Sequence, residues 1–421
     1  MNYLLFFIYL FLLCLLLTKS KFINQTSVGS STIVILFLLR ILAGLVNGWI
    51  NLHLYSISDS VGFHEESIAE YHLLFTNPKE YLLNLFTNNT QSSYGAIFDT
   101  TDSFWNNLRS NIIIKLLSLF NIFSNCNYFI NILFYNFFVF FGSVSLYKIF
   151  IQIFPERKNT LIVTLFLLPS FLYFTSSIHR DGLIFLAIAF ISLNVFSMVK
   201  NDRISLKRIV YISLNLSLIF LLRNFVFIAM VPALIAWIIA EKKRKATLPA
   251  FILVYVFFTL MFFTLRFIHP KLDLPQYVSA RQLAFAQLGK GASSAININP
   301  LFPDFRSFFN NSPQALNHSL MRPYLSEIKT LLYIPPAMEI LAYEILFLAY
   351  IFFSVKRNGS TGFIYYGICF TLSMYLIIGY TIPILGALVR YRSIYWPFIV
   401  TPISCLIDLD RVKRYIFKIN I

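Results

Sequence analysis

Long apolar runs, separated by short polar segments, are the feature that most constrains how this chain can fold. The segment 247–268, for example, contains one charged residue, Arg266. A helix of about 20 apolar residues crosses the hydrocarbon core of a bilayer. Hydrophobic residues make up 58% of the chain and charged residues 12%, whereas a soluble domain has about 25% charged residues. We therefore predict an all-α protein whose fold is a polytopic transmembrane helical bundle.

The apolar runs predict about eleven spans within a single transmembrane domain over 1–421. They lie at 3–19, 32–52, 128–150, 160–176, 181–199, 208–222, 224–240, 247–268, 336–355, 361–379 and 391–408. Two long outer loops, 53–127 and 269–335, are expected to contain interfacial helices. The segment 106–124 is one of them, because Arg109 and Lys115 interrupt its apolar run. If this segment spans instead, the first loop moves to the cytoplasm.

Basic residues cluster in alternate short loops, and the chain carries a net charge of +16. The clusters are Glu156 to Lys158, Lys200 to Arg208, Glu241 to Lys245, Lys356-Arg357 and Arg411 to Arg414. Because positive loops stay in the cytoplasm, we predict a multi-pass protein of the inner (plasma) membrane with a cytoplasmic C-terminus. The surplus charge also favours anionic lipid headgroups and lipid-linked phosphates. The sequence contains no nucleic-acid-binding motif, so no nucleic-acid partner is predicted.

Carboxylates follow the second predicted span, close to the membrane surface. They are Asp59, Glu65, Glu66 and Glu70. A carboxylate near low-dielectric lipid tends to have a raised pKa, which suits it to act as a general base. The alternative is a solvated loop whose acids balance nearby lysines and arginines. The four acids are therefore candidate catalytic residues.

Cationic side chains interrupt the apolar pattern at several boundaries. The candidate substrate-binding residues are His179, Arg180, Asp181, Arg223, Arg322, Arg390 and Arg392. Guanidinium groups suit phosphate oxygens, and the aromatic residues around Arg390 and Arg392 could face a sugar. The alternatives are a local Arg180–Asp181 pair, a snorkelling Arg223 and an interfacial belt around Arg390. Glu339 is a weaker candidate, since a carboxylate at the start of a helix is also favoured by the helix dipole.

Several familiar signatures are absent from the sequence. A Walker A loop, an HExxH motif and a GxSxG elbow do not occur, which argues against ATP-driven transport by this chain alone, zinc proteolysis and serine hydrolysis. The four cysteines are far apart and show no metal-binding spacing. We predict no cofactor and no metal site.

The layout resembles the bacterial multispanning membrane glycosyltransferases of the GT-C type and, more distantly, the O-antigen polymerases of polysaccharide biosynthesis. The residues that carry this resemblance are Asp59 after an early span, Leu168-Pro169-Ser170 through His179-Arg180-Asp181-Gly182, Arg322-Pro323 with Glu327, and Gly386 through Arg392. The family often has two adjacent acids in its first outer loop. In this sequence Asp59 is followed by Ser60, and Glu65-Glu66 comes later.

The resemblance implies a donor whose sugar or oligosaccharide is linked to polyprenyl phosphate. Asp59 would act as the base toward the acceptor hydroxyl, with Glu65, Glu66 or Glu70 as substitutes. Cationic side chains would stabilise the leaving phosphate; these are Arg180, Arg223, Arg390 and Arg392. The expected partners are the lipid bilayer, the lipid-linked sugar and other polysaccharide-assembly proteins. The alternatives are a non-catalytic flippase or exporter of lipid-linked glycans, and a membrane scaffold subunit.

Overall fold

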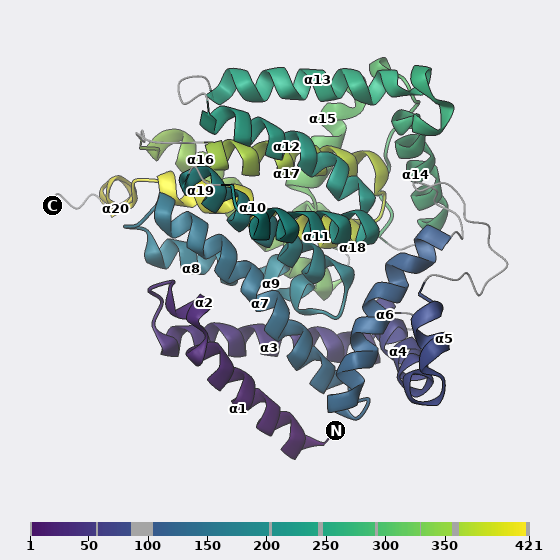
Figure 1. The fold of residues 1–421 in the computed structure, drawn as a ribbon. Coiled ribbons are helices and arrows are strands. Elements are labelled where there is room, and N and C mark those ends of the chain that lie inside the picture. The colour runs from purple at the N-terminus through teal and green to yellow at the C-terminus, as the bar shows by residue number, and fades with distance from the viewer. Residues whose placement is uncertain are drawn as a thin grey trace. The chain divides into compact units, whose positions relative to one another are not determined.

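The computed structural model describes residues 2–55, 58–85, 104–201, 204–242, 247–290, 294–328, 330–355 and 362–417, and every regular element in these ranges is a helix (Figure 1). The predicted all-α class is therefore confirmed for the described part of the chain. The predicted cluster Lys356-Arg357 lies outside the described residues. So do residues 202–203 and 243–245 of the other predicted clusters and residues 86–103 of the first predicted loop.

Seven helical segments of the described chain are long and apolar enough to cross a membrane. They are α3 (Ser30–His53), α7 (Tyr128–Ile153), α10 (Arg180–Asn201), α12 (Asn224–Lys242), α13 (Thr247–Ile268), η3 with α16 (Leu331–Phe353) and α17 (Gly362–Thr381). A bent pair, α8 (Lys158–Phe166) and α9 (Pro169–Ser176), which meet at 49°, brings the number to eight if the pair forms one span. The chain is therefore a multi-pass membrane protein.

Two of the predicted spans are divided in the structure, and each division coincides with a proline. The segment 160–176 breaks before Pro169, and 391–408 is shared between α18 (Leu385–Ser393) and α19 (Trp396–Leu406), which has Pro397 in its first turn. A proline lacks the backbone N–H and its ring clashes with the preceding turn, so a helix restarts there. Two other predicted spans, α1 (Tyr3–Lys19) and α11 (Leu206–Leu222), have 17 residues each. The count of about eleven spans stays a prediction.

The remaining helices are shorter or more polar. They are α2 (Lys21–Asn24), α4 (Asp59–Thr76), α5 (Pro78–Leu83), α6 (Phe104–Ser124), η1 (Pro270–Leu272), α14 (Leu274–Leu288), α15 (Phe305–Met321), η2 (Leu325–Glu327) and α20 (Leu409–Phe417). The predicted interfacial segment 106–124 corresponds to α6, which packs against α4 and α7. Its position relative to a membrane interface stays a prediction.

The chain folds into two compact units. The first comprises Met1–Ile153 and Phe171–Phe227, and the second comprises Phe154–Ser170 and Ile228–Ile421. In the first unit α7 is the central helix, since it packs against α3, α6 and α10 and most of its length is buried. Aromatic pairs such as Phe37–Phe140, with ring centroids 5.6 Å apart, fill the space between α3 and α7.

In the second unit α17 packs against α14, α15 and α19. The α15–α17 contact is close, because a Cβ added at Gly379 would overlap the backbone of Ala315. Two side-chain bonds cross the same contact: the Tyr380 hydroxyl donates to the Phe308 carbonyl at 2.7 Å, and Ser319 Oγ donates to the Tyr375 carbonyl at 2.6 Å. Packing of backbone on backbone at a small residue is typical of helices in membranes.

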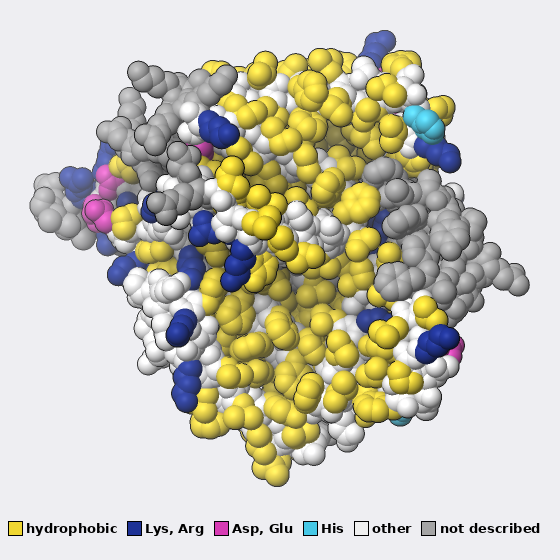
Figure 2. All heavy atoms as spheres, in the orientation of Figure 1, with side chains coloured by type: hydrophobic (Ala, Val, Ile, Leu, Met, Phe, Trp, Pro, Cys, Tyr) yellow, Lys and Arg dark blue, Asp and Glu magenta, His cyan; other side chains and the backbone are white. Residues whose placement is uncertain are grey.

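Large apolar side chains remain exposed on the described helices. On α13, Leu253 is 72% exposed and Phe257 is 57% exposed, and hydrophobic side chains cover most of the face that Figure 2 shows. A soluble monomer rarely exposes so continuous an apolar surface. These side chains therefore face the lipid of a bilayer.

Candidate functional site

The turn between α9 and α10, in the first unit, interrupts the helical backbone between two apolar helices. Because α9 ends at Ser176 and α10 begins at Arg180, the last carbonyls of α9 have no partner within their own helix. In an apolar region such groups need other donors. Two side chains supply them: Arg40 of α3 donates to the Thr175 carbonyl at 2.7 Å, and Asn136 of α7 donates to the Ser176 carbonyl at 2.8 Å. The Tyr135 hydroxyl of α7 donates to the His179 carbonyl within the turn itself.

Arg40 and Tyr135 are contributors that the sequence reasoning missed. Arg40 is 2% exposed, lies near the middle of α3 and also donates to the Thr175 hydroxyl at 3.0 Å. The signal in the sequence was an arginine alone inside an apolar run, because an ionisable residue within a span is costly and generally functional. Tyr135 carries no such signal, since tyrosine is common throughout this chain.

Gly182, in the first turn of α10, allows this turn to close. A Cβ at this position would overlap the Tyr135 hydroxyl and lie 2.8 Å from the Thr175 carbonyl oxygen. Any larger residue would therefore push Tyr135 away from the carbonyl of His179. The glycine of the His179-Arg180-Asp181-Gly182 sequence has a steric role here.

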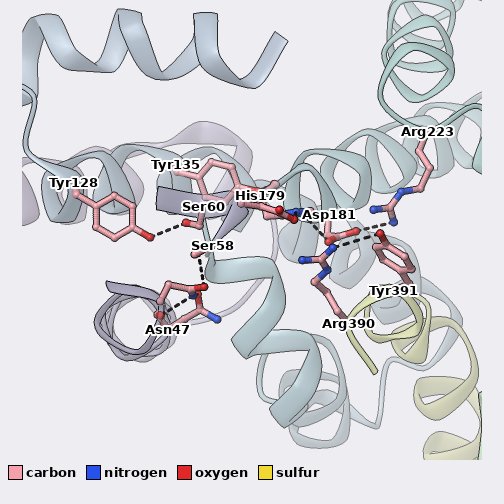
Figure 3. Close-up of polar contacts among 12 residues, drawn as sticks. Asn47, Ser58, Ser60, Tyr128, Tyr135, His179, Asp181, Arg223, Arg390 and Tyr391 are labelled. Atoms are coloured by element: carbon pink, nitrogen blue, oxygen red, sulfur yellow. Dashed lines mark hydrogen bonds and ion pairs between the residues drawn. The ribbon is translucent and has the colours of Figure 1, made fainter. Parts of the chain in front are cut away.

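Four predicted site residues meet at this turn, and we call them the Asp59–Arg223 cluster: Asp59, His179, Asp181 and Arg223. His179 Nδ1 lies 2.8 Å from Asp181 Oδ2, and His179 Nε2 lies 3.2 Å from Asp59 Oδ2. Arg223 Nη1 lies 2.7 Å from Asp181 Oδ1 (Figure 3). The side chain of Asp181 is fully buried and that of His179 is 5% exposed, whereas Asp59 is 51% exposed.

The cluster links its exposed end, Asp59, through His179 to a buried ion pair. Arg223 compensates the buried Asp181 carboxylate, which lies against Nδ1 of the His179 ring and fixes its position. The Nε2 atom of the same ring faces Asp59, whose carboxylate is half exposed. Asp59 can therefore accept or release a proton toward the outside of the cluster. Within the described ranges, no group of three or more His, Cys, Asp or Glu side chains is arranged to hold a metal ion.

Positive charge is concentrated around this cluster. Arg109 of α6 is buried, and its burial together with the positive charges of Arg180 and Arg223 lowers its pKa to about 10. The Arg180 guanidinium lies over the Phe63 ring at 5.6 Å. Guanidinium groups that repel one another favour an anion among them, because an anion compensates several charges at once. The sequence reasoning treated Arg109 only as a break in an apolar run.

The other predicted acids of α4 lie away from the cluster. Glu65 and Glu66 are exposed, and partial burial raises the pKa of Glu66. Glu70 lies eleven residues beyond Asp59, about 16 Å along the helix. It contacts Lys115 Nζ at 2.5 Å and accepts a bond from Asn84 at 2.8 Å. Glu70 therefore ties α4 to α6.

The predicted arginines of the second unit have different surroundings. Arg322 pairs with Glu327 at 3.1 Å, and the Arg390 guanidinium lies over the Tyr391 ring at 5.0 Å. Arg392 is 1% exposed and donates to the Ser319 carbonyl at 2.9 Å. Arg392 thus holds the end of α15, and substrate contacts by these three arginines stay predictions.

Glu339 is buried in α16 and serves as a cap for another helix. Both of its carboxylate oxygens accept from the Ser170 backbone N–H, at 3.2 and 3.1 Å, in the first turn of α9. Its Oε1 also accepts from the Tyr343 hydroxyl at 2.5 Å. A carboxylate is favoured at a helix N-terminus. The helix concerned is α9, which restarts after the bend, and not the helix that carries Glu339.

His318 of α15 makes the stability of the protein sensitive to acid. Its burial, with the positive charge of Arg322, lowers its pKa from 6.5 to about 4. The unfolded chain takes up this proton below pH 6.5 and the folded protein does not, so stability is lost as the pH falls from 6.5 toward 4. We expect H318Q to lose less thermal stability than the parent protein between about pH 7 and about pH 4.5. H72Q, at an exposed histidine, should behave like the parent, and an unchanged acid response in H318Q would contradict this assignment.

Comparison of the chain with protein-family models, with curated proteins and with solved structures finds no match. The chemistry of the site therefore has to be inferred from its geometry.

Proposed function

We propose that this protein is a membrane glycosyltransferase or repeat-unit polymerase that uses a polyprenyl-phosphate-linked sugar donor in cell-surface polysaccharide synthesis. The observation that carries the proposal is the Asp59–Arg223 cluster, in which a half-exposed carboxylate contacts a buried imidazole that a second, buried carboxylate orients. A carboxylate that takes a proton from an acceptor hydroxyl must be exposed to the substrate and must also be held in place by a neighbouring side chain. Asp59 meets both conditions, while Glu65 and Glu66 have access only.

In the proposed reaction the acceptor hydroxyl gives its proton to Asp59 while its oxygen bonds to the anomeric carbon of the donor sugar. The bond between that carbon and the phosphate oxygen breaks, and the polyprenyl phosphate leaves with the electron pair. Arg109, Arg180 and Arg223 give the first unit a positive field that stabilises the phosphate charge as it develops. A lipid carrier is already confined to the plane of the bilayer, which reduces the entropic cost of bringing it to the site.

The substitution D59N tests this function, because it keeps the size of the side chain and removes its ability to accept a proton. We expect transfer to fall about 100-fold to 10,000-fold, the usual contribution of a general base. The measurement is polymer formation in membrane vesicles supplied with lipid-linked glycan extracted from cells that lack the protein. D410N, the same change at an exposed position of α20, is the matched control and should transfer at the parental rate.

Binding distinguishes the enzyme from a flippase or exporter of lipid-linked glycans. An enzyme whose base is lost should still bind the extracted lipid-linked glycan with parental affinity while forming no product. A carrier without chemistry needs no base, so D59N would still move glycan across the vesicle membrane. Parental transfer by D59N would overturn the proposal.

A further inference from the structure

Helix α20 begins beside the ends of two other helices of the second unit, α16 and α19. After α16 ends at Phe353, Ser354 pairs with Ile407, the residue after α19. Val355 N–H donates to the Leu406 carbonyl and Asp408 N–H donates to the Phe353 carbonyl, each at 2.9 Å. Because Phe353 ends a candidate span, this pairing places the start of α20 beside the end of that span (Figure 1).

Asp408, the residue before α20, caps the first turn of this helix. Asp408 Oδ1 accepts from the backbone N–H groups of Asp410 and Arg411, each at 3.1 Å. The preceding carbonyl of Ile407 accepts from Arg157 Nη2 at 3.1 Å. The helix is thus anchored at its first residue and continues away from the paired segment.

The side chains of α20 divide between two faces. A helical period of 100° per residue puts Leu409, Val412 and Tyr415 within one arc, with Arg414 on the opposite side and Arg411 and Lys413 at the two edges of the arc. The basic residues are exposed. Leu409 is 44% exposed and Tyr415 is 76% exposed, although the Tyr415 ring also contacts Phe353 at 5.5 Å between centroids.

We propose that α20 lies on the membrane surface and docks there on anionic phospholipid headgroups. Its apolar arc enters the boundary between headgroups and acyl chains, and Tyr415 takes the interfacial position that tyrosine favours. Arg411, Lys413 and Arg414 outnumber the single acid of the helix, Asp410, so their charge complements an anionic leaflet. Because α20 combines apolar and basic side chains and begins at the end of a candidate span, a lipid surface suits it better than a purely polar partner does.

Hydrogen exchange of the full-length protein in nanodiscs tests this inference independently of the proposed function. One set of nanodiscs contains phosphatidylcholine alone, and the other contains equal parts of phosphatidylcholine and phosphatidylglycerol. We expect the backbone amides of α20 to exchange more slowly in the anionic nanodiscs, and high salt to remove the difference, because salt screens exposed charges. Equal exchange in the two lipids would overturn the proposal, since the lipid headgroup is the only component that differs between the two samples.

A charge-neutralised variant sharpens the test. Each basic side chain near an anionic leaflet strengthens surface binding about fivefold, so the triple variant R411Q/K413Q/R414Q should dock roughly 100-fold more weakly and lose the added protection. The control K19Q/K21Q/K271Q removes the same charge from exposed positions elsewhere and should keep it. Unchanged exchange in α16 would show that the triple variant is folded. Parental protection of α20 in that variant would contradict an electrostatic contact with lipid.

Discussion

We expect R223M to lower the free energy of unfolding by about 3–5 kcal/mol, because it leaves the carboxylate of Asp181 buried without its cation. Asp181 is fully buried, and its Oδ1 lies 2.7 Å from Arg223 Nη1. Methionine keeps much of the arginine's volume, so the loss comes mainly from the charge. The measurement is reversible unfolding of the purified protein in mixed detergent micelles as the denaturing detergent is titrated in.

The double variant D181N/R223M separates the charge from other effects. If the buried carboxylate is the cause, neutralising it should restore part of the lost stability, so the two substitutions are not additive. R306M, the same substitution at an exposed arginine of α15, should change stability by less than about 0.5 kcal/mol. Additive losses in the double variant, or a loss of less than about 1 kcal/mol in R223M, would contradict the assigned ion pair.

The second large effect is expected for G379A, which we predict to lose about 3 kcal/mol or more of stability. The added methyl group overlaps the backbone of Ala315, and a helix backbone cannot rotate away as the end of a flexible side chain can. Helices α15 and α17 would have to separate. The hydroxyl bonds of Tyr380 and Ser319 across that contact would then lengthen.

G62A is the matched control for this effect. Gly62 lies in α4, and a Cβ there would meet no atom within 4 Å. Alanine is the better helix former, so G62A should raise stability by about 0.5–1 kcal/mol. Thermal unfolding of both variants in detergent, with hydrogen exchange of α15, provides the measurement. If G379A were as stable as the parent, the close approach of α15 and α17 would be wrong.

The sequence predicted helices best where a run of apolar residues continues without interruption. The predicted run 247–268 coincides with α13, and 128–150 lies within α7. The predicted span 160–176 is divided by a bend before Pro169, and the restarted helix is capped by Glu339, a residue 169 positions away from Ser170. The sequence contained the proline but could not show where the freed N–H would find an acceptor.

For the site, the sequence identified residue types at boundaries but not their contacts. Asp59, His179, Asp181 and Arg223 were each predicted from local surroundings, and the fold of the first unit brings these four together. The same reasoning offered Glu70 as a substitute for Asp59, although Glu70 pairs with Lys115. Local sequence does not determine which charges meet, because His179 and Asp59 are separated by 120 positions.

That this protein is helical and spans a membrane follows from its amino acids alone, because hydrophobicity and helical period are properties of short segments and do not depend on distant residues. Which polar groups are buried together follows only from the packing of the helices. Arg40 and Tyr135 close the turn before α10 only because α3 and α7 pack beside it. In a medium without water every exposed backbone carbonyl must find a donor, and that donor comes from whichever helix packing brings near.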